Sequence, residues 1–528
     1  MGYAGRFRTL IFVCIAATAC TEEPQLRLGG DLLHGEFVEG TTIAVFRGIG
    51  FAEPPLGDLR WHKPLPIQTV VQHSRANDFA PACMQPMRIL DWYRDLAETF
   101  GASRNVFDDL VTSEDCLYLN IWTPELRPDL ALPVMVYIHG GSNKSGWSYE
   151  PNYHGHKLAE GGVVMVSIAY RLGVFGFLSH PDLSDAPVVA NFALWDQIAA
   201  LRWLQENVRH FGGDPQKITV FGESSGAQNI LALMASDEAK GLFHGAILQS
   251  TAGFGIGQSP LLHDEQMRGV QTANLFGFVG EDSLQKLRSV PAAELLRVYE
   301  EKFASLYHSP ALDGQILKKP VWDIILSGDL AKVPFIIGSN ADEWYSSTPE
   351  DVTAQNVEEA VESSSLLNSP VSLKAVRNET DFREAIDRIE TAENMLCPSQ
   401  YLAGLQNDLK NKAWVYNFSR IRDGVAGASV RAYHGAELPY VFGTHDSWIT
   451  TTDIDWRLSR EMVGYWLQFA KTGNPNRAGL AAWPAFSGPD KQVMDFTDKS
   501  SLVAPPDPVL CGVFRESIDR QRITTGTQ

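Results

Sequence analysis

One serine of this 528-residue chain lies between two glycines, in the stretch 222–226 that reads Gly-Glu-Ser-Ser-Gly. The apolar run 218–221 before it is typical of a buried strand, and the residues after Ser224 are able to start a helix. A strand that turns directly into a helix brings backbone against backbone, which only residues without Cβ allow. The pattern therefore predicts a nucleophile elbow, a turn that lifts the Ser224 hydroxyl above the sheet for attack on a carbonyl carbon.

A serine hydroxyl is a poor nucleophile unless a base removes its proton during the attack. In chains with such an elbow the order along the sequence is serine, acid, histidine. His434 is the preferred base, because it stands in a loop after the predicted strand 414–418. His445 is the alternative, and His244 is too close to the elbow helix to return to the serine.

The base in turn needs an acid that fixes its tautomer and offsets its developing charge. Asp342 and Glu343 both follow the predicted strand 333–338, at the carboxyl edge of the sheet where sites form. Their spacing does not choose between them. The alternative for either residue is a solvated charge on a loop.

Acyl transfer also requires backbone N–H groups that stabilise a developing oxyanion. Ser225 would offer one at the start of the helix after the elbow. The stretch 139–142, His-Gly-Gly-Ser, ends the predicted strand 133–138, and its glycines would let a second set of donors approach closely.

The elements that must position these groups alternate between strand and helix. Buried apolar runs at 133–138, 163–169 and 218–221, with a helical pattern over 191–207, predict an α/β fold. We expect a central, mostly parallel, doubly wound sheet with helices on both faces. Later strands are predicted at 246–249, 333–338 and 414–418, and a late helix at 457–472.

Two further features concern the rest of the chain. The stretch 114–124 alternates apolar and polar residues before a proline, which is typical of an edge strand. The segments of about 255–330 and 345–412 are mostly helical and acidic, with no linker-like composition, and are interpreted as insertions that cover the strand ends. We therefore expect one domain over 20–528.

Composition limits the classes of partner. The chain has 63 acidic against 44 basic residues and a formal net charge of −19, which excludes a surface that tracks nucleic-acid phosphates. Its 44% hydrophobic content is enough for a large core. The proposed chemistry calls for no metal and no cofactor, and the sequence leaves the oligomeric state open.

The N-terminus predicts an export signal over 1–19, with two early arginines, a short apolar run and small residues before Cys20. Ordinary signal cleavage and lipoprotein processing would both cut before Cys20. The other mature cysteines form an even set of four, so Cys20 is the odd one. We favour acylation of Cys20, a membrane tether and a periplasmic or outer-membrane location over plain secretion.

Five longer motifs carry a resemblance to a known family. They lie at 51–57 (Phe-Ala-Glu-Pro-Pro-Leu-Gly), 114–120 (Glu-Asp-Cys-Leu-Tyr-Leu-Asn), 211–215 (Phe-Gly-Gly-Asp-Pro), 221–227 (Phe-Gly-Glu-Ser-Ser-Gly-Ala) and 434–437 (His-Gly-Ala-Glu). From about residue 27 to 520, the chain resembles the type B carboxylesterase and cholinesterase family, which has the α/β-hydrolase fold. The resemblance implies a serine hydrolase that cleaves small carboxylic esters through an acyl-enzyme.

The same resemblance assigns roles to single positions. It implies Ser224 as nucleophile, Glu343 as acid and His434 as base, and it implies oxyanion donors at Gly141, Ser142 and Ser225. It further implies disulfides that join Cys83 to Cys116 and Cys397 to Cys511. Two rival functions stay in view: a lipase or sterol-ester hydrolase of the same family, and a non-catalytic adhesion-type member, which would typically lack the serine.

Overall fold

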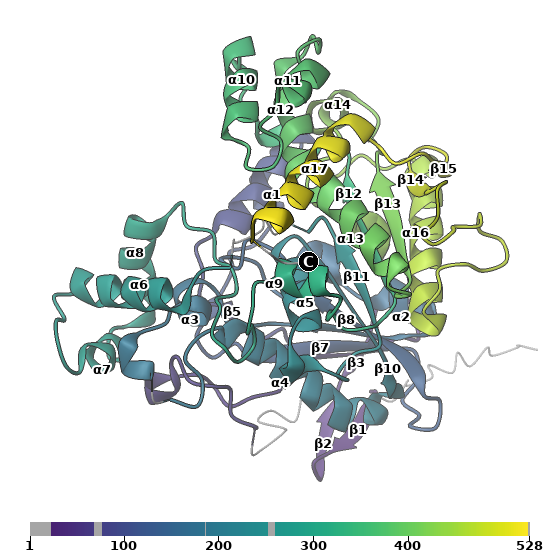
Figure 1. Ribbon diagram of the computed structural model, residues 1–528. Helices are drawn as coiled ribbons and strands as arrows, with labels where there is room; N and C mark the ends of the chain where they lie inside the picture. The colour runs from purple at the N-terminus through teal and green to yellow at the C-terminus, as the bar shows by residue number, and fades with distance from the viewer. Residues whose placement is uncertain (1–22, 68–75, 185, 252–258, 526–528) are drawn as a thin grey trace, which may run out of the picture.

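The computed structural model describes residues 23–67, 76–184, 186–251 and 259–525, which are built around one sheet of 11 strands (Figure 1). In chain order the strands of this sheet are β3 (Glu36–Phe37), β4 (Ala44–Gly50), β7 (Tyr118–Thr123), β8 (Leu132–Ile138), β9 (Val164–Ile168), β10 (Gly213–Glu223), β11 (Gly245–Gln249), β12 (Phe335–Asn340), β13 (Ala413–Phe418), β14 (Val493–Phe496) and β15 (Ser501–Val503). In space their order is β15-β14-β13-β12-β11-β10-β8-β9-β7-β4-β3. All strands from β14 to β9 run parallel, and those outside them pair antiparallel, which confirms the predicted mostly parallel sheet.

Helices cover both faces of the sheet, as alternation along its strands requires. In β8, Val134, Val136 and Ile138 join an apolar core with helices α4 (Phe192–Asn207) and α5 (Ser225–Met234). Met135 and Tyr137, between them in sequence, join a second core with helix α16 (Asp453–Thr472). The predicted helices at 191–207 and 457–472 are thus present, and each seals one face of the sheet.

Strand β7 corrects one expectation, because it lies inside the sheet between β9 and β4 and is not an edge strand. The polar residue that suggested an exposed face is Asn120. It is buried, and both ends of its side-chain amide form hydrogen bonds. Its Nδ2 donates to the hydroxyls of Ser148 and Ser167, and its Oδ1 accepts from the Gly48 N–H, where the β4 pairing shifts register. The polar residue in this alternating pattern is therefore a buried side chain with satisfied hydrogen bonds, and it does not mark a solvent-exposed face of the strand.

The two predicted insertions are helical, and part of each projects from the sheet, on different sides in Figure 1. The first contains α6 (Leu262–Leu275), α7 (Ser283–Arg288), α8 (Ala292–Phe303) and α9 (Val321–Ser327). The second contains α10 (Ala354–Ser363), α11 (Pro370–Val376), α12 (Phe382–Thr391) and α13 (Cys397–Asp408), and it packs on the C-terminal helix α17 (Pro508–Thr525).

Both expected disulfides are present. One joins Cys83 to Cys116, and the other joins Cys397 at the start of α13 to Cys511 in α17. Such bonds persist in oxidising compartments, so they indicate an extracytoplasmic location. The predicted signal segment and Cys20 lie outside the described residues.

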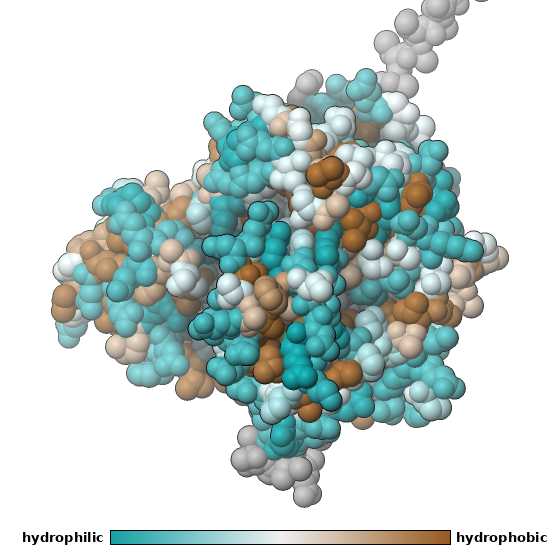
Figure 2. Space-filling view, turned by 90° about the horizontal axis from the view of Figure 1, so that it is seen from above, coloured by the Kyte–Doolittle hydropathy of each residue, from teal (hydrophilic) through white to brown (hydrophobic). Residues whose placement is uncertain are grey.

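Within the described ranges, no helix is both long and apolar enough to cross a bilayer. Figure 2 shows one face in which hydrophilic residues predominate and hydrophobic ones are scattered among them. The large apolar side chains of the described residues are mostly in the two cores around the sheet.

Candidate active site

Ser224 occupies the corner between β10 and α5 in a backbone conformation that side chains rarely adopt, with φ 55° and ψ −128°. The neighbouring glycines allow this corner. A Cβ on Gly222 would lie 2.6 Å from the Ile138 carbonyl oxygen, and one on Gly226 would lie 2.1 Å from the same atom. The strained turn leaves Ser224 partly exposed while the residues on either side of it are buried, as an elbow requires.

The turn after β8 approaches the elbow closely. A Cβ on Gly140 would lie 3.0 Å from the Cβ of Ser224, so glycine is needed there. Gly141 and Ser142 have positive φ values of 100° and 62°. Among the described residues, the backbone N–H groups of Gly141 and Ser142 have no hydrogen-bond acceptor. The Asn143 N–H donates to the Ser225 hydroxyl at 3.0 Å, which ties this turn to the start of α5.

Glu343 follows β12 and is buried against the sheet edge. Its Oε1 accepts from the Asn340 N–H at 2.7 Å, and its Oε2 lies 2.6 Å from Nδ1 of His434. Asp342, the neighbour that sequence spacing could not separate from it, forms an ion pair with Arg431 at 3.2 Å. The two carboxylates therefore face different partners, and only that of Glu343 contacts His434.

His434 brings a second carboxylate into the site. Its Nε2 lies 3.0 Å from Oε1 of Glu223, the residue before the elbow serine. Within the described ranges, no hydrogen bond joins the Ser224 hydroxyl to His434. Burial disfavours the charged imidazolium, yet the carboxylates of Glu223 and Glu343 outweigh burial and raise the pKa of His434 well above its ordinary value.

Two other side chains complete the surroundings of the imidazole. The Trp344 indole stacks on the His434 ring, with centroids 5.2 Å apart and planes at 18°. Glu437 is buried and accepts from Nε2 of Gln249 at 2.9 Å and from Nδ2 of Asn340 at 2.7 Å. Burial, reinforced by the charges of Glu223 and Glu343, raises the pKa of Glu437 to about 7.

Sequence reasoning gave no role to Glu223, Glu437 or Trp344, although each had a local signal. Glu223 and Glu437 lie inside two of the motifs at 221–227 and 434–437, and Trp344 directly follows the acid. Which way these side chains point depends on tertiary packing, which motif spacing does not encode.

The remaining candidate histidines lie elsewhere. The His445 Nδ1 is 3.0 Å from Nη2 of Arg422, and its ring packs edge-on against Tyr440 and Trp456. The His244 Nδ1 accepts from the Ile218 N–H, in the middle of β10 and away from the serine that follows this strand. In the described part of the chain, no three His, Cys, Asp or Glu side chains are grouped so as to hold a metal ion.

Comparison with known proteins identifies relatives along nearly the whole chain. Residues 24–507 match the model of the carboxylesterase family. A para-nitrobenzyl esterase of Bacillus subtilis is 34% identical over 490 residues, covering 89% of this chain and 95% of that protein. A fumonisin B1 esterase of Sphingopyxis macrogoltabida is 32% identical over 504 residues, covering 89% and 86%.

The three-dimensional fold agrees with these sequence matches. A solved carboxylesterase of Geobacillus stearothermophilus superposes with a TM-score of 0.77 at 28% identity, covering 93% of this chain and 99% of that one. A solved thermophilic PNB esterase gives a TM-score of 0.79 at 29% identity, covering 93% and 100%. The elbow, the fold and the matched length lead to one conclusion: this chain belongs to the carboxylesterase family and is a serine hydrolase of carboxylic esters.

Proposed function

We propose that Ser224, Glu343 and His434 form the catalytic triad of this esterase. The observation that carries the proposal is the 2.6 Å contact between Nδ1 of His434 and Oε2 of Glu343, beside a serine on a strained elbow. Glu343 fixes the imidazole tautomer and offsets the charge that develops on it. In the reactive state, Nε2 of His434 leaves Glu223 and accepts a hydrogen bond from the adjacent Ser224 hydroxyl. Catalytic hydrogen bonds of this kind often form fully only when substrate is bound.

The reaction proceeds through an acyl-enzyme. The Ser224 Oγ attacks the ester carbonyl carbon while Nε2 of His434 takes the hydroxyl proton. The C–O bond to the alcohol then breaks, and His434 returns the proton to the leaving oxygen. Water repeats the attack on the acyl-enzyme with His434 as base and releases the acid.

We assign the stabilisation of the tetrahedral oxyanion to the N–H groups of Gly141, Ser142 and Ser225. The support is that Gly141 and Ser142 lie on the turn nearest the elbow and that their N–H groups have no acceptor among the described residues. Ser225 begins α5, where the helix N-terminus adds its partial positive charge. Each such donor is worth about 3 kcal/mol in the transition state.

Hydrolysis of p-nitrophenyl esters from acetate to palmitate by wild type and Ser224→Ala tests this assignment. We expect wild type to prefer short acyl chains and Ser224→Ala to lose at least about 10³-fold in kcat. Ser363→Ala, a serine on α10, is the matched control and should keep wild-type activity. Retention of activity by Ser224→Ala would refute the triad, and a rate that rises with chain length would favour the lipase alternative.

We further propose that residues 20–528 form one exported domain whose Cys20 is acylated. The support is the signal-like segment 1–19, the odd cysteine at its end and the two disulfides. Labelled palmitate should enter the wild-type protein and not Cys20→Ser. Absence of label from wild type would exclude the lipid tether and leave plain secretion.

A further inference from the structure

The turn that carries the proposed oxyanion donors Gly141 and Ser142 is in contact with an arginine from another part of the chain. Arg88 is the first residue of helix α1 (Arg88–Thr99). Its Nη2 donates to the Gly141 carbonyl oxygen at 3.2 Å and to the Ser142 hydroxyl at 3.0 Å. A guanidinium therefore holds both of the residues on this turn that are assigned to the oxyanion.

The residues that lead into α1 fix the position of Arg88 against the turn. Gln85 is buried, and its side-chain amide forms two hydrogen bonds with the backbone of Gly146. Its Nε2 donates to the Gly146 carbonyl oxygen at 2.7 Å, and its Oε1 accepts from the Gly146 N–H at 2.7 Å. The Pro86 carbonyl oxygen accepts from the Ser145 hydroxyl at 3.3 Å. The start of α1 is thus tied to the turn at several points, and Arg88 reaches it from a fixed backbone.

The Gly141 carbonyl oxygen accepts three hydrogen bonds. The backbone N–H groups of Lys144 and Ser145 donate to it at 3.1 and 3.0 Å, and Arg88 adds a charged donor. This carbonyl and the Ser142 N–H are the two ends of one peptide group. Donation to the oxygen polarises the peptide, and a charged donor does so most strongly. The Ser142 N–H is therefore a better hydrogen-bond donor than an isolated backbone amide.

The positive charge of Arg88 is not paired with a carboxylate. Within the described ranges Arg88 forms no ion pair, whereas Lys144, a second cation at this turn, is paired with Glu300 at 2.9 Å. The Arg88 side chain is exposed, so water screens part of its charge. The remainder is uncompensated beside the place where negative charge develops on the ester oxygen, and it favours that charge.

We infer that Arg88 is a positioning residue of the esterase reaction, which holds the turn of Gly141 and Ser142 and strengthens the Ser142 N–H as an oxyanion donor. The inference rests on the proposed function, because it requires attack by Ser224 and an oxyanion at this turn. Its effect belongs to the transition state, since the ester oxygen carries little charge before the attack. Loss of Arg88 should therefore lower kcat and leave KM nearly unchanged.

Hexyl trifluoromethyl ketone, labelled with carbon-13 at its carbonyl carbon, tests the inference on the full-length protein. The Ser224 Oγ bonds to the labelled carbon, the electron pair of the C=O π bond moves to the oxygen, and the hydroxyl proton passes to Nε2 of His434. The carbon-13 chemical shift of this hemiketal follows the ionisation of its oxygen as the pH changes, so it measures how well the site stabilises an oxyanion.

We expect Arg88→Met to raise the pKa of the hemiketal hydroxyl by about one unit and to weaken binding of the ketone about tenfold. The kcat on p-nitrophenyl acetate should fall by about the same factor. This effect is smaller than the roughly 10²- to 10³-fold loss expected when an oxyanion donor is removed, because Arg88 acts through the peptide and water screens its charge.

Three further variants separate this role from general destabilisation. Arg88→Lys keeps the charge and a donor, so it should recover most of the loss. Arg460→Met, which removes an exposed arginine of α16, should behave as wild type does. Ser142→Ala removes the hydroxyl that Arg88 contacts, so adding Arg88→Met to it should cost less activity than in wild type.

The outcomes distinguish the inference from the proposed function. A hemiketal that forms in Arg88→Met and titrates as it does in wild type would overturn the inference and leave the triad intact. If wild type forms no adduct, or if Ser224→Ala forms the same one, Ser224 is not the nucleophile and the inference falls with the proposed function.

Discussion

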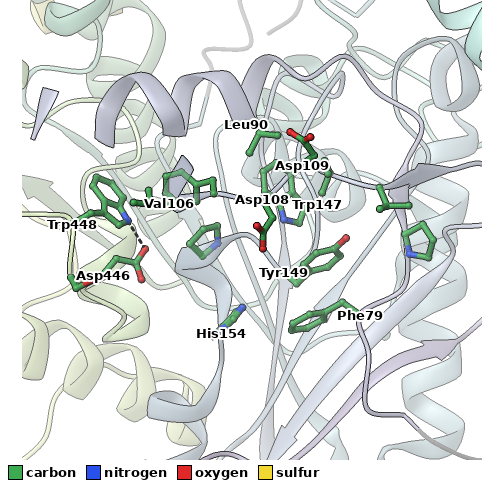
Figure 3. Close-up of a pocket in the computed structure, with 16 residues that line it drawn as sticks. Phe79, Leu90, Val106, Asp108, Asp109, Trp147, Tyr149, His154, Asp446 and Trp448 are labelled. Atoms are coloured by element: carbon green, nitrogen blue, oxygen red, sulfur yellow. Dashed lines mark hydrogen bonds between the residues drawn. The ribbon is translucent and has the colours of Figure 1, made fainter. Parts of the chain in front are cut away.

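The carboxylates around His434 and those that line a separate cavity with aromatic walls, the aromatic cavity of Figure 3, carry negative charge in two different environments. Glu223, Glu343 and Glu437 are buried, and the protein balances them with protons, as the raised pKa values of His434 and Glu437 indicate. The aspartates of the cavity are nearer to solvent, and Asp108 has neither a proton donor nor a cation among the described residues. Burial thus turns surplus charge into a proton-binding site, whereas partial exposure lets water solvate the charge.

The largest effect should come from the carboxylate in direct contact with the imidazole. Glu343→Gln replaces an acceptor of the Nδ1 proton by an amide, so the ring loses its required tautomer. We expect kcat on p-nitrophenyl acetate to fall about 10⁴-fold with the fold retained.

Asp342→Asn is the matched control, because it changes the adjacent residue by the same chemistry. Its partner is Arg431, so the variant should lose far less activity than Glu343→Gln. An equal or larger loss in Asp342→Asn would mean that the site uses the other carboxylate.

Glu437 should contribute to the pH dependence of stability, together with Glu150 and Asp387, whose pKa values burial also raises. Its pKa is about 7 in the folded protein against 4.5 in the unfolded chain, so between these values the folded state holds a proton that the unfolded state has released. Its stabilisation is therefore full below about pH 4.5 and is lost as the pH rises through 7. The loss is on the order of 3 kcal/mol of unfolding free energy.

Urea titrations at pH 5 and pH 8 measure this slope. Glu437→Gln should flatten it in part relative to wild type, since the shares due to His434, Glu150 and Asp387 would persist. Glu516→Gln, an exposed glutamate on α17, should keep the wild-type slope. A slope unchanged by Glu437→Gln would show that Glu437 does not exchange its proton on unfolding.

The elements that carry the site were predictable because local rules determine them. A β-branched run, a glycine and a serine before a helical pattern specify the elbow, and the predicted strands at 133–138, 218–221 and 333–338 correspond to β8, β10 and β12. The glycine at position 226 likewise indicates a crowded backbone, because a Cβ added there would meet the carbonyl oxygen of Ile138. The edge assignment for 114–124 was wrong because Asn120 finds its partners on other strands and loops.

The charge balance of the site was not predictable, since it depends on contacts between distant segments. Spacing left Asp342 and Glu343 equivalent, the resemblance alone implied Glu343, and the physical difference between them is the direction of their side chains. The approach of Glu223 to His434 joins residues 211 positions apart, which no local pattern reports. The cavity is similar in this respect, because its wall combines segments from Phe79 to Trp448.

The smallest effect that we expect is a change in the pKa of His434 when its second carboxylate partner, Glu223, is neutralised. Glu223 faces Nε2 of His434 and helps to raise its pKa, so Glu223→Gln should lower that pKa. Since the neutral imidazole is the base, the acidic limb of kcat/KM should move to lower pH while the plateau changes little. Glu98→Gln, on an exposed face of helix α1 (Arg88–Thr99), should leave the limb in place. A limb that moves to higher pH in Glu223→Gln would mean that Glu223 destabilises the imidazolium, and the buried cluster would then differ from the cavity in more than its exposure to solvent.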